Sequence, residues 1–447
     1  MRMGALPLRA QPPLGVFDAH HPPDEGLLKV CVHCGFCLPT CPTYRLWGQE
    51  MDAPRGRIYL MQLGLKGEIS LDGIVAGHFD ACLGCAACVT ACPSGVRYDR
   101  LIGATRSQLE RNWKRRRGER LMRGMMLRLF PYPQRLRVAA VAAWAYQRLR
   151  LGRLLRRVGL FRRLPAELQA LEELVPVVCL KDLHRRIPER TPAAGTAVMR
   201  VGMVTGCVQS VFFAGVNRAT VRVLAAEGCE VIAPRAQGCC GALMHHAGDE
   251  AAALEKARRM ITAFEGTAVE RIVVNAAGCG STLKEYGYLL RDDPEWAPRA
   301  AAFSAKVRDI TEFLEELPVH VTRHPIAATA VYLDACHLAH AQGIRAQPRR
   351  QLRAIPGLAV AEVGDAEICC GSAGIYNLVR TEAAAELGRR KVAEILRASP
   401  DLIVTGNPGC ALQIRRHLAT SDNRIPILHP VELIDASIRG AEPFPPL

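Results

Sequence analysis

The sequence predicts a multidomain protein of the α+β class, in which a largely helical N-terminal domain precedes two copies of an α/β unit built on a parallel sheet. Three observations lead to this prediction: two runs of cysteine near the N-terminus, a strongly basic middle segment, and cysteines that recur at strand ends in the second half. With 447 residues, 49% of them hydrophobic, the chain has room for about three domains with sizeable cores. We expect domains at 1–105, 106–197, 198–320 and 321–447.

The N-terminal domain carries two cysteine runs of equal spacing, and each run ends in proline. They are Cys31-x-x-Cys34-x-x-Cys37-x-x-x-Cys41-Pro42 and Cys82-x-x-Cys85-x-x-Cys88-x-x-x-Cys92-Pro93. This spacing is typical of a two-cluster bacterial-type ferredoxin, in which the last cysteine of each run ligates the other [4Fe–4S] cluster. The predicted ligands of the first cluster are Cys31, Cys34, Cys37 and Cys92, and those of the second are Cys82, Cys85, Cys88 and Cys41. Such a domain transfers single electrons.

Zinc and disulfides are the alternatives for these cysteines. A zinc site uses four ligands as two pairs, which leaves the third closely spaced cysteine of each run without a role. Disulfides require an oxidising compartment, and the N-terminal residues MRMGALPLRAQPPLGVFDAHHPP contain no apolar core long enough for a secretory signal. The spacing therefore favours iron–sulfur clusters.

The connecting segment, 106–197, holds nearly all of the net charge of +15. Between Arg111 and Arg163 there are seventeen Arg or Lys and one acidic residue, Glu119. Leu, Met, Phe and Trp are interleaved with the arginines, and Pro131 and Pro133 predict a break between two helical stretches. This pattern favours an amphipathic surface that docks on an anionic membrane or an acidic partner. A solvated helical face is the alternative, and nucleic acid is disfavoured because no recognition fold accompanies the patch.

After a Pro- and Ala-containing linker at 191–197, a cysteine pattern occurs twice. The first copy has Cys207, Cys239-Cys240-Gly241 and Cys279, and the second has Cys336, Cys369-Cys370-Gly371 and Cys410. The intervals are 32 and 39 residues in the first copy, and 33 and 40 in the second. Each copy reads as strand, helix, strand, CCG loop, helix, strand, with helices expected at 214–227, 249–264 and 382–397. Because the cysteines follow strands, we expect four thiols to converge at the carboxyl edge of each sheet.

These eight cysteines have three candidate roles: ligands of a further iron–sulfur centre, a redox-active dithiol, or an apo site. We favour a metal centre in at least one unit, because adjacent cysteines do not easily form a disulfide with each other but can bridge irons. Cys179 and Cys229 lie outside the repeat, and we expect both to be buried as small apolar residues. The histidines beside the cysteines, and Arg55 and Arg57, receive no assigned role.

Several segments resemble the iron–sulfur subunit of bacterial glycolate oxidase. They are CVHCGFCLPTCPTYRLWGQEMDAPRGRIYLM, CLGCAACVTACPSGVRY, GCCGA, GCGSTLKEYG, CCGSAGIYNL and GNPGC. The resemblance covers nearly the whole chain and is weakest in the basic segment. Wider relatives include heterodisulfide reductase subunits, whose CCG units end in Cys-x-x-Cys and bind a non-cubane [4Fe–4S] centre. Here only Cys279 and Cys410 stand at those ends, so a non-cubane centre lacks one ligand in each unit.

The resemblance implies that the chain passes electrons to a membrane or quinone-linked acceptor during oxidation of glycolate to glyoxylate. Flavin and substrate then belong to separate FAD-binding subunits, because the sequence has no nucleotide-binding fingerprint. We expect no catalytic residue and no flavin on this chain, and a cytoplasmic location, peripheral on the inner membrane. The alternative is an iron–sulfur subunit of another oxidoreductase: heterodisulfide reductase, anaerobic glycerol-3-phosphate dehydrogenase, or another D-2-hydroxy acid dehydrogenase.

Overall fold

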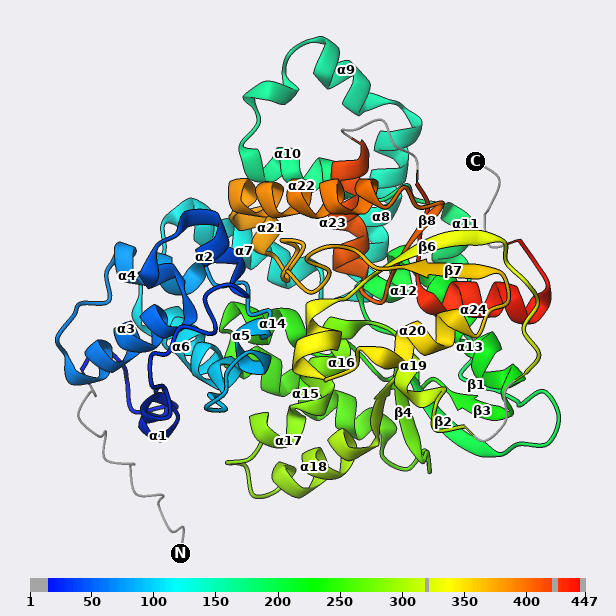
Figure 1. Cartoon of the computed structure of the whole chain (residues 1–447), viewed down its shortest axis with the longest axis horizontal. Coiled ribbons are helices and arrows are strands. Elements are labelled where there is room, and N and C mark those ends of the chain that lie inside the picture. The colour runs from blue at the N-terminus through cyan, green and yellow to red at the C-terminus, as the bar shows by residue number, and fades with distance from the viewer. Residues whose placement is uncertain (1–14, 318–320, 420–424, 443–447) are drawn as a thin grey trace, which may run out of the picture. The chain divides into compact units, whose positions relative to one another are not determined.

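The structure, a computed structural model, describes residues 15–317, 321–419 and 425–442. Residues 1–14, the first part of the N-terminal stretch that contains no apolar core for a secretory signal, lie outside the described residues. The chain divides into two compact units, one of Met1–Arg116 with His246–Asp249 and the other of Arg117–His245 with Glu250–Leu447. Figure 1 labels their elements. Among the described residues, no helix combines the length and the apolar character that are needed to cross a bilayer.

The first unit is helical, as the sequence predicts. Its helices are α1 (Glu25–Lys29), α2 (Pro42–Trp47), the 3-10 helix η1 (Glu50–Asp52), α3 (Pro54–Lys66), α4 (Gly73–Asp80), α5 (Ala87–Thr90) and α6 (Tyr98–Asn112). Pro54 begins α3, and Gly67, in the left-handed conformation with φ of 72°, ends it. Met61 of α3, Phe79 of α4 and Leu101 of α6 are fully buried in the core that these helices enclose.

The basic segment is more broken than the sequence predicts. It forms α7 (Arg117–Leu129), α8 (Pro133–Arg148), α9 (Leu151–Arg157), the 3-10 helix η2 (Phe161–Arg163), α10 (Ala166–Leu174) and α11 (Leu180–His184). The break at Pro131 and Pro133 is present, but the expectation of two helical stretches is wrong. A further break falls at Arg150, whose φ of 55° is incompatible with a continuous helix.

The first cysteine repeat folds around a five-stranded sheet. Its elements are β1 (Arg190–Thr191), β2 (Met199–Val204), α12 (Val208–Phe212), α13 (Ala214–Ala226), β3 (Cys229–Ile232), α14 (Ala242–Ala247), α15 (Glu250–Phe264), β4 (Arg271–Val274), α16 (Ala277–Lys284), α17 (Tyr286–Leu289), α18 (Trp296–Lys306), β5 (Val307–Asp309) and α19 (Ile310–Phe313). The start of the expected linker is instead β1, which pairs antiparallel with β3. The other strands are parallel, in the order β3-β2-β4-β5.

The second repeat has the same topology. Its elements are β6 (Ala328–Leu333), the π-helix η3 (His337–Ala341), α20 (Ala346–Arg353), β7 (Leu358–Ala361), α21 (Tyr376–Val379), α22 (Thr381–Arg397), β8 (Leu402–Thr405), α23 (Pro408–Ala419), β9 (Ile427–Leu428) and α24 (Pro430–Arg439). The parallel order β7-β6-β8-β9 matches β3-β2-β4-β5 strand for strand. The repeat seen in the cysteines is therefore a repeat of the fold, with one more parallel strand per copy than expected.

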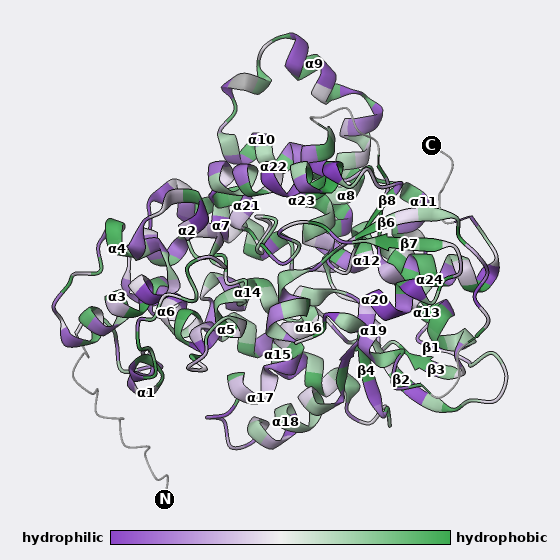
Figure 2. Ribbon diagram, in the orientation of Figure 1, coloured by the Kyte–Doolittle hydropathy of each residue, from purple (hydrophilic) through white to green (hydrophobic). Residues whose placement is uncertain are grey.

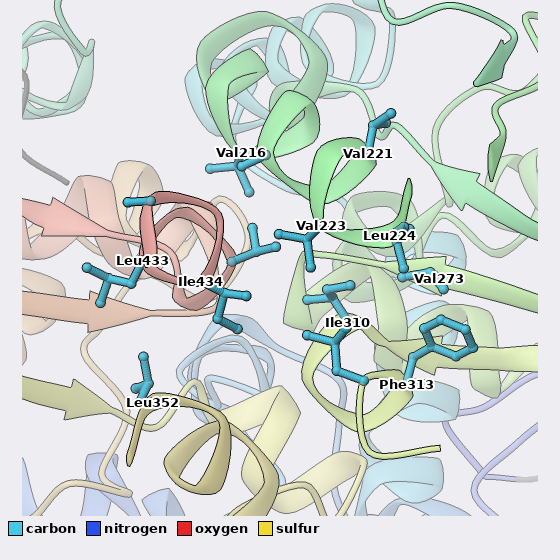
Figure 3. Close-up of a cluster of buried hydrophobic side chains, with 14 of the residues drawn as sticks. Val216, Val221, Val223, Leu224, Val273, Ile310, Phe313, Leu352, Leu433 and Ile434 are labelled. Carbon is cyan, nitrogen blue, oxygen red and sulfur yellow. The ribbon is translucent and has the colours of Figure 1, made fainter. Parts of the chain in front are cut away.

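One hydrophobic core joins the two repeats (Figure 3). Leu224 of α13 and Phe313 of α19 come from the first repeat, and Leu352 of α20 and Ile434 of α24 from the second. In Figure 2 the strands β6 and β8 are mostly hydrophobic, as expected for strands that helices cover on both faces. At the edge of the shared core, Arg222 of α13 forms two hydrogen bonds, of 2.8 and 2.7 Å, with the carboxylate of Asp435 in α24.

Candidate functional site

The two N-terminal cysteine runs adopt the same backbone conformation. In the first run His33 and Gly35 have φ of 54° and 90°, and in the second Gly84 and Ala86 have φ of 64° and 60°. These are matched positions, one before and one after the second cysteine of each run. Left-handed residues at both positions curl each loop, so that its first three thiols point inward.

The thiols of the first run gather around a small hollow. A cavity of about 30 Å³ is lined by Cys31, Cys34 and Cys37 of the first run and by Cys88 and Cys92 of the second. Burial raises the pKa of Cys31, and the negative charges of Cys92 and Cys34 raise it further. Cys34 is exposed, and Cys31, Cys37 and Cys92 are half-buried, which leaves this site open to solvent on one side.

Four thiols form a second, buried group made of Cys82, Cys85, Cys88 and Cys41. Burial raises the pKa of Cys88 well above its ordinary value, and the charges of the other three thiols add to this effect. Cys41 lies immediately before α2, where its sulfur is 3.2 Å from the Oγ1 atom of Thr43. Four thiolates are the donor set that an iron–sulfur cluster requires.

Basic and polar groups face the buried set. Burial acts to raise the pKa of Cys82, but the charges of Arg57 and Arg106 and hydrogen bonds from the Gly84 amide and the Tyr98 hydroxyl outweigh it, so this pKa is lowered. The Gly84 nitrogen lies 3.3 Å and the Tyr98 hydroxyl 3.8 Å from the Cys82 sulfur. The protein therefore favours a thiolate at Cys82 although the residue is buried.

Arg57, which received no role from the sequence, is buried within this unit. Its side chain is fully buried, donates to the carbonyl of His78 at 2.6 Å and to Thr43 Oγ1 at 3.2 Å, and pairs with Asp52 at 3.4 Å. Its burial has no signature in the sequence, because an arginine in an amphipathic helix is usually exposed.

In the first repeat the four thiols converge at the carboxyl edge of the sheet. Cys207 precedes α12, the Cys239–Cys240 pair lies in the loop after β3, and Cys279 is in α16 after β4. The Cys207 and Cys239 sulfurs are 3.6 Å apart. Hydrogen bonds from the Cys207 and Cys240 thiols lower the pKa of Cys239 well below its ordinary value, and Cys240 contacts Cys279 in turn.

The second repeat brings its thiols together in the same connectivity. Cys369 contacts Cys336 and Cys370, and hydrogen bonds from the Cys369 and Cys410 thiols lower the pKa of Cys370. A lysine lies near each set: Lys256 near Cys239 and Lys391 near Cys370.

The glycine of each CCG loop is required by a close approach of the backbone. Gly241 and Gly371 have φ of 81° and 89°, and an added Cβ would lie 3.0 Å from the carbonyl oxygen of Ala253 and 2.7 Å from that of Ala384. Any side chain would displace the first loop from α15 or the second from α22, and with it the two cysteines.

Asn407, three residues before Cys410, joins the two thiol sets. Its Nδ2 atom donates to the Cys410 sulfur at 3.4 Å, and its Oδ1 atom accepts from the Gly278 amide, next to Cys279, at 3.3 Å. Of the two cysteines outside the repeat, Cys229 is buried as expected, but Cys179 is exposed because it starts the short surface helix α11, so that expectation is wrong.

Comparison with known families agrees with this layout. A 4Fe-4S dicluster domain matches residues 27–96, the linker region of the glycolate oxidase iron–sulfur subunit matches 118–175, and a cysteine-rich domain matches 201–284 and again 330–415. Iron–sulfur clusters are thus the cofactors of this chain, and the α+β multidomain class is confirmed.

Two relatives match most of this chain, and a third matches about half of it. The chain is 41% identical over 397 residues to a probable glycolate oxidase iron–sulfur subunit of Bacillus subtilis, which spans 88% of this chain and 89% of the relative. It is 34% identical over 420 residues to the glycolate oxidase iron–sulfur subunit of Escherichia coli, at 93% and 95% coverage. Lactate utilization protein A of an Exiguobacterium species is 29% identical over 242 residues, which are 54% of this chain and 99% of that protein. On these matches, the chain belongs to the glycolate oxidase iron–sulfur subunit family.

Proposed function

We propose that this chain is the electron-transfer subunit of a glycolate oxidase complex. The observation that carries the proposal is the pair of thiol sets in the first unit, one half-exposed and one buried, in a chain of this family. When bound, each [4Fe–4S] cluster accepts and releases one electron at a time, as the two electrons of a hydroxy acid require once they have reached a flavin. The chain itself holds the clusters and sets their surroundings.

The ligand assignment is part of the proposal. The half-exposed cluster is held by Cys31, Cys34, Cys37 and Cys92, and the buried one by Cys82, Cys85, Cys88 and Cys41. The negative charge of Cys92 acting on Cys31, and that of Cys41 acting on Cys88, support this exchange of the fourth cysteine. The exposed Cys34 makes the first cluster the natural point of electron exchange with a partner, because electron transfer weakens steeply with distance.

The cysteine-rich domains extend the proposal. Cys207, Cys239, Cys240 and Cys279, and likewise Cys336, Cys369, Cys370 and Cys410, offer four thiols each, and we assign a further iron–sulfur centre to at least one of these sets. The low pKa of Cys239 and of Cys370 supports it, because a ligand of iron is a thiolate. We also keep the division into domains 1–105, 106–197, 198–320 and 321–447 as a proposal.

Partners and location complete the proposal. FAD-binding subunits oxidise glycolate to glyoxylate and supply the electrons, and a membrane or quinone-linked acceptor receives them. The basic segment supports peripheral attachment to a membrane, because more than half of the exposed large apolar side chains among the described residues lie between Leu121 and Leu160, within that segment.

Electron paramagnetic resonance of the complete complex tests the function. Glycolate should reduce at least two [4Fe–4S] clusters, and Cys34→Ala or Cys85→Ala should abolish acceptor reduction while the flavin subunits still bind glycolate. Cys92→Ser should remove the same signal as Cys34→Ala, because both residues belong to one cluster.

Counting iron and sulfide on the isolated chain separates two clusters from three or four. Clusters that stay oxidised with glycolate would refute the substrate, and zinc in place of iron would refute the function.

A further inference from the structure

A second cavity lies in the other unit, at the carboxyl edge of the first sheet. It has a volume of about 440 Å³ and is walled by the start of α8, the segment that follows α11, and the loop between β3 and the CCG cysteines, with Cys239 among its lining residues. This volume falls within the range of small-molecule pockets. Apart from Cys239, no residue that lines this cavity is a cluster ligand in the function proposed above.

The lining is strongly cationic. Seven basic side chains line the cavity: Arg135, Arg137, Arg185, Arg186, Arg235, Lys256 and Arg259. The described residues that line it include no aspartate or glutamate. The seven basic residues belong to four separate parts of the chain, so the charge results from the fold and not from a single basic run.

Carboxylates near the rim compensate only part of this charge. Lys256 pairs with Glu255 at 2.9 Å, and the exposed Arg235 lies 3.8 Å from Glu189. Arg259 donates to the carbonyl of Ala236 at 3.2 Å, a neutral acceptor. Among the described residues, neither Arg137 nor Arg186 forms an ion pair.

Arg137 shows the imbalance most directly. Its Nε atom is buried and has no hydrogen-bond partner within the described structure. Burial lowers the pKa of Arg137, and the positive charge of Arg186 lowers it further. Two guanidinium groups that line one cavity and repel each other, without a carboxylate in its lining, are costly in the absence of an anion.

The walls are preformed. The side-chain oxygen of Gln237 accepts from the Thr205 amide at 2.9 Å, and its nitrogen donates to the Met203 carbonyl at 3.1 Å. Asn217 donates to the Thr205 carbonyl at 2.8 Å. These bonds fix the sheet edge, so that a ligand does not have to order it.

We propose that this cavity binds a small organic anion that carries at least two negative charges, as phosphates or as carboxylates, between Arg137 and Arg186. Guanidinium groups bind both kinds of oxyanion through paired charge-assisted hydrogen bonds. The ligand would lie beside Cys239, so its occupancy would be felt at the first cysteine-rich thiol set.

Calorimetric titration of the full chain with inorganic pyrophosphate and with citrate tests the proposal. Both probes carry several charges, and the tighter one identifies the phosphate or the carboxylate class. Arg137→Gln with Arg186→Gln should weaken binding of the tighter probe at least about tenfold, since hydrogen bonds between charged groups are lost. The matched control is Arg153→Gln with Arg157→Gln, two exposed arginines of α9 that do not line the cavity, and it should bind as the wild type does.

Thermal unfolding provides a second readout that does not depend on activity. Without probe, the Arg137→Gln, Arg186→Gln variant should melt no lower than the wild type, because removing two repelling charges costs no native ion pair. With saturating probe, only the wild type and the control should gain melting temperature. The proposal fails if neither probe binds the wild type, or if the cavity variant and the control bind equally well. It also fails if the cavity variant unfolds at a lower temperature without probe, which would give the arginines a purely structural role.

Discussion

At the scale of single residues, Arg57 connects the structure of the first unit with its chemistry. Burial opposes its charge, but nearby acidic groups, among them Cys82, Cys41 and Asp52, raise the pKa of Arg57 above its ordinary value. A permanently charged guanidinium therefore lies within the field of the buried thiol set. It balances Asp52 and favours the thiolates on which cluster binding depends.

Replacing Arg57 should be costly. Arg57→Gln leaves the buried Asp52 carboxylate with His78, whose Nδ1 atom lies 2.9 Å from it, as its remaining side-chain partner, and we expect the free energy of unfolding to fall by about 3 kcal/mol. The matched control in the same helix is Arg55→Gln, whose partner Glu50 is 41% exposed, and its loss should cost about 1 kcal/mol or less. Anaerobic urea unfolding followed by circular dichroism measures both. Equal losses in the two variants would contradict the structural role of Arg57.

Residues whose role depends on spacing could be predicted, and residues whose role depends on burial could not. The sixteen cysteines of the two runs and the two repeats were selected by their intervals, and in each repeat the structure brings the four thiols together. Arg57 and Asn407 had no such signature, because a buried cation and an amide that bonds to a sulfur look in sequence like any polar residue. Cys179 shows the opposite error: an apolar preference does not tell on which side of a short helix a residue lies.

At the scale of elements, the cap of α24 makes stability depend on pH. His429 caps this helix: its Nδ1 atom accepts from the Val431 amide at 3.1 Å, and Glu432 accepts from the His429 amide at 2.9 Å. The ring must be neutral to accept that bond, and burial lowers the pKa of His429 to about 3. Its contribution is therefore complete above the unfolded pKa of about 6.5 and is lost as the pH falls toward 3.

The magnitude follows from the two pKa values. Between pH 8 and pH 5 the His429 cap should lose about 2 kcal/mol. His429→Asn keeps a capping oxygen without a titrating ring, so its unfolding free energy should fall by about 2 kcal/mol less over this range. Burial also lowers the pKa of His417, to about 4. Because the variant retains His417, its unfolding free energy should still fall as the pH is lowered, with a slope similar to the one that His429 contributes. Urea unfolding at several pH values measures the slopes, with the exposed His20→Asn as control; an unchanged slope in His429→Asn would exclude this role of the cap.

Helices and strands of the repeats could be predicted more closely than those of the basic segment. The expected helices at 214–227, 249–264 and 382–397 correspond to α13, α15 and α22 within one residue at either end. They lie between strands with a clear apolar pattern, whereas no strand separates the helices from α7 to α9 in the basic segment. There the break at Arg150 has no Gly or Pro to announce it. The edge strand β1 was missed because two residues are too few to show alternation.

At the scale of the whole molecule, the basic segment combines anchored and exposed faces within its unit. Met126 of α7 and Leu136 of α8 are fully buried, in clusters that involve α10, α11 and α21. The exposed fraction is 76% for Leu121, 73% for Val138 and 68% for Leu149. Hydrophilic and hydrophobic residues alternate along α9 (Figure 2). Among the described residues of this helix, only Gly152 is buried. Deleting the whole segment would disrupt the buried clusters, so surface substitutions give the cleaner test of membrane attachment.

Sedimentation with lipid vesicles tests that attachment. The chain should bind vesicles of phosphatidylcholine that contain phosphatidylglycerol and should bind pure phosphatidylcholine weakly, because the arginines add affinity only for anionic headgroups. Arg153→Gln with Arg157→Gln should lower the partition to anionic vesicles roughly 30-fold, from about 1 kcal/mol for each basic residue. Arg389→Gln with Arg390→Gln removes the same charge from exposed positions of α22, outside the segment, and should bind as the wild type does. Binding that is equal on both vesicle types, or equally reduced in both variants, would show that net charge and not this surface determines the interaction.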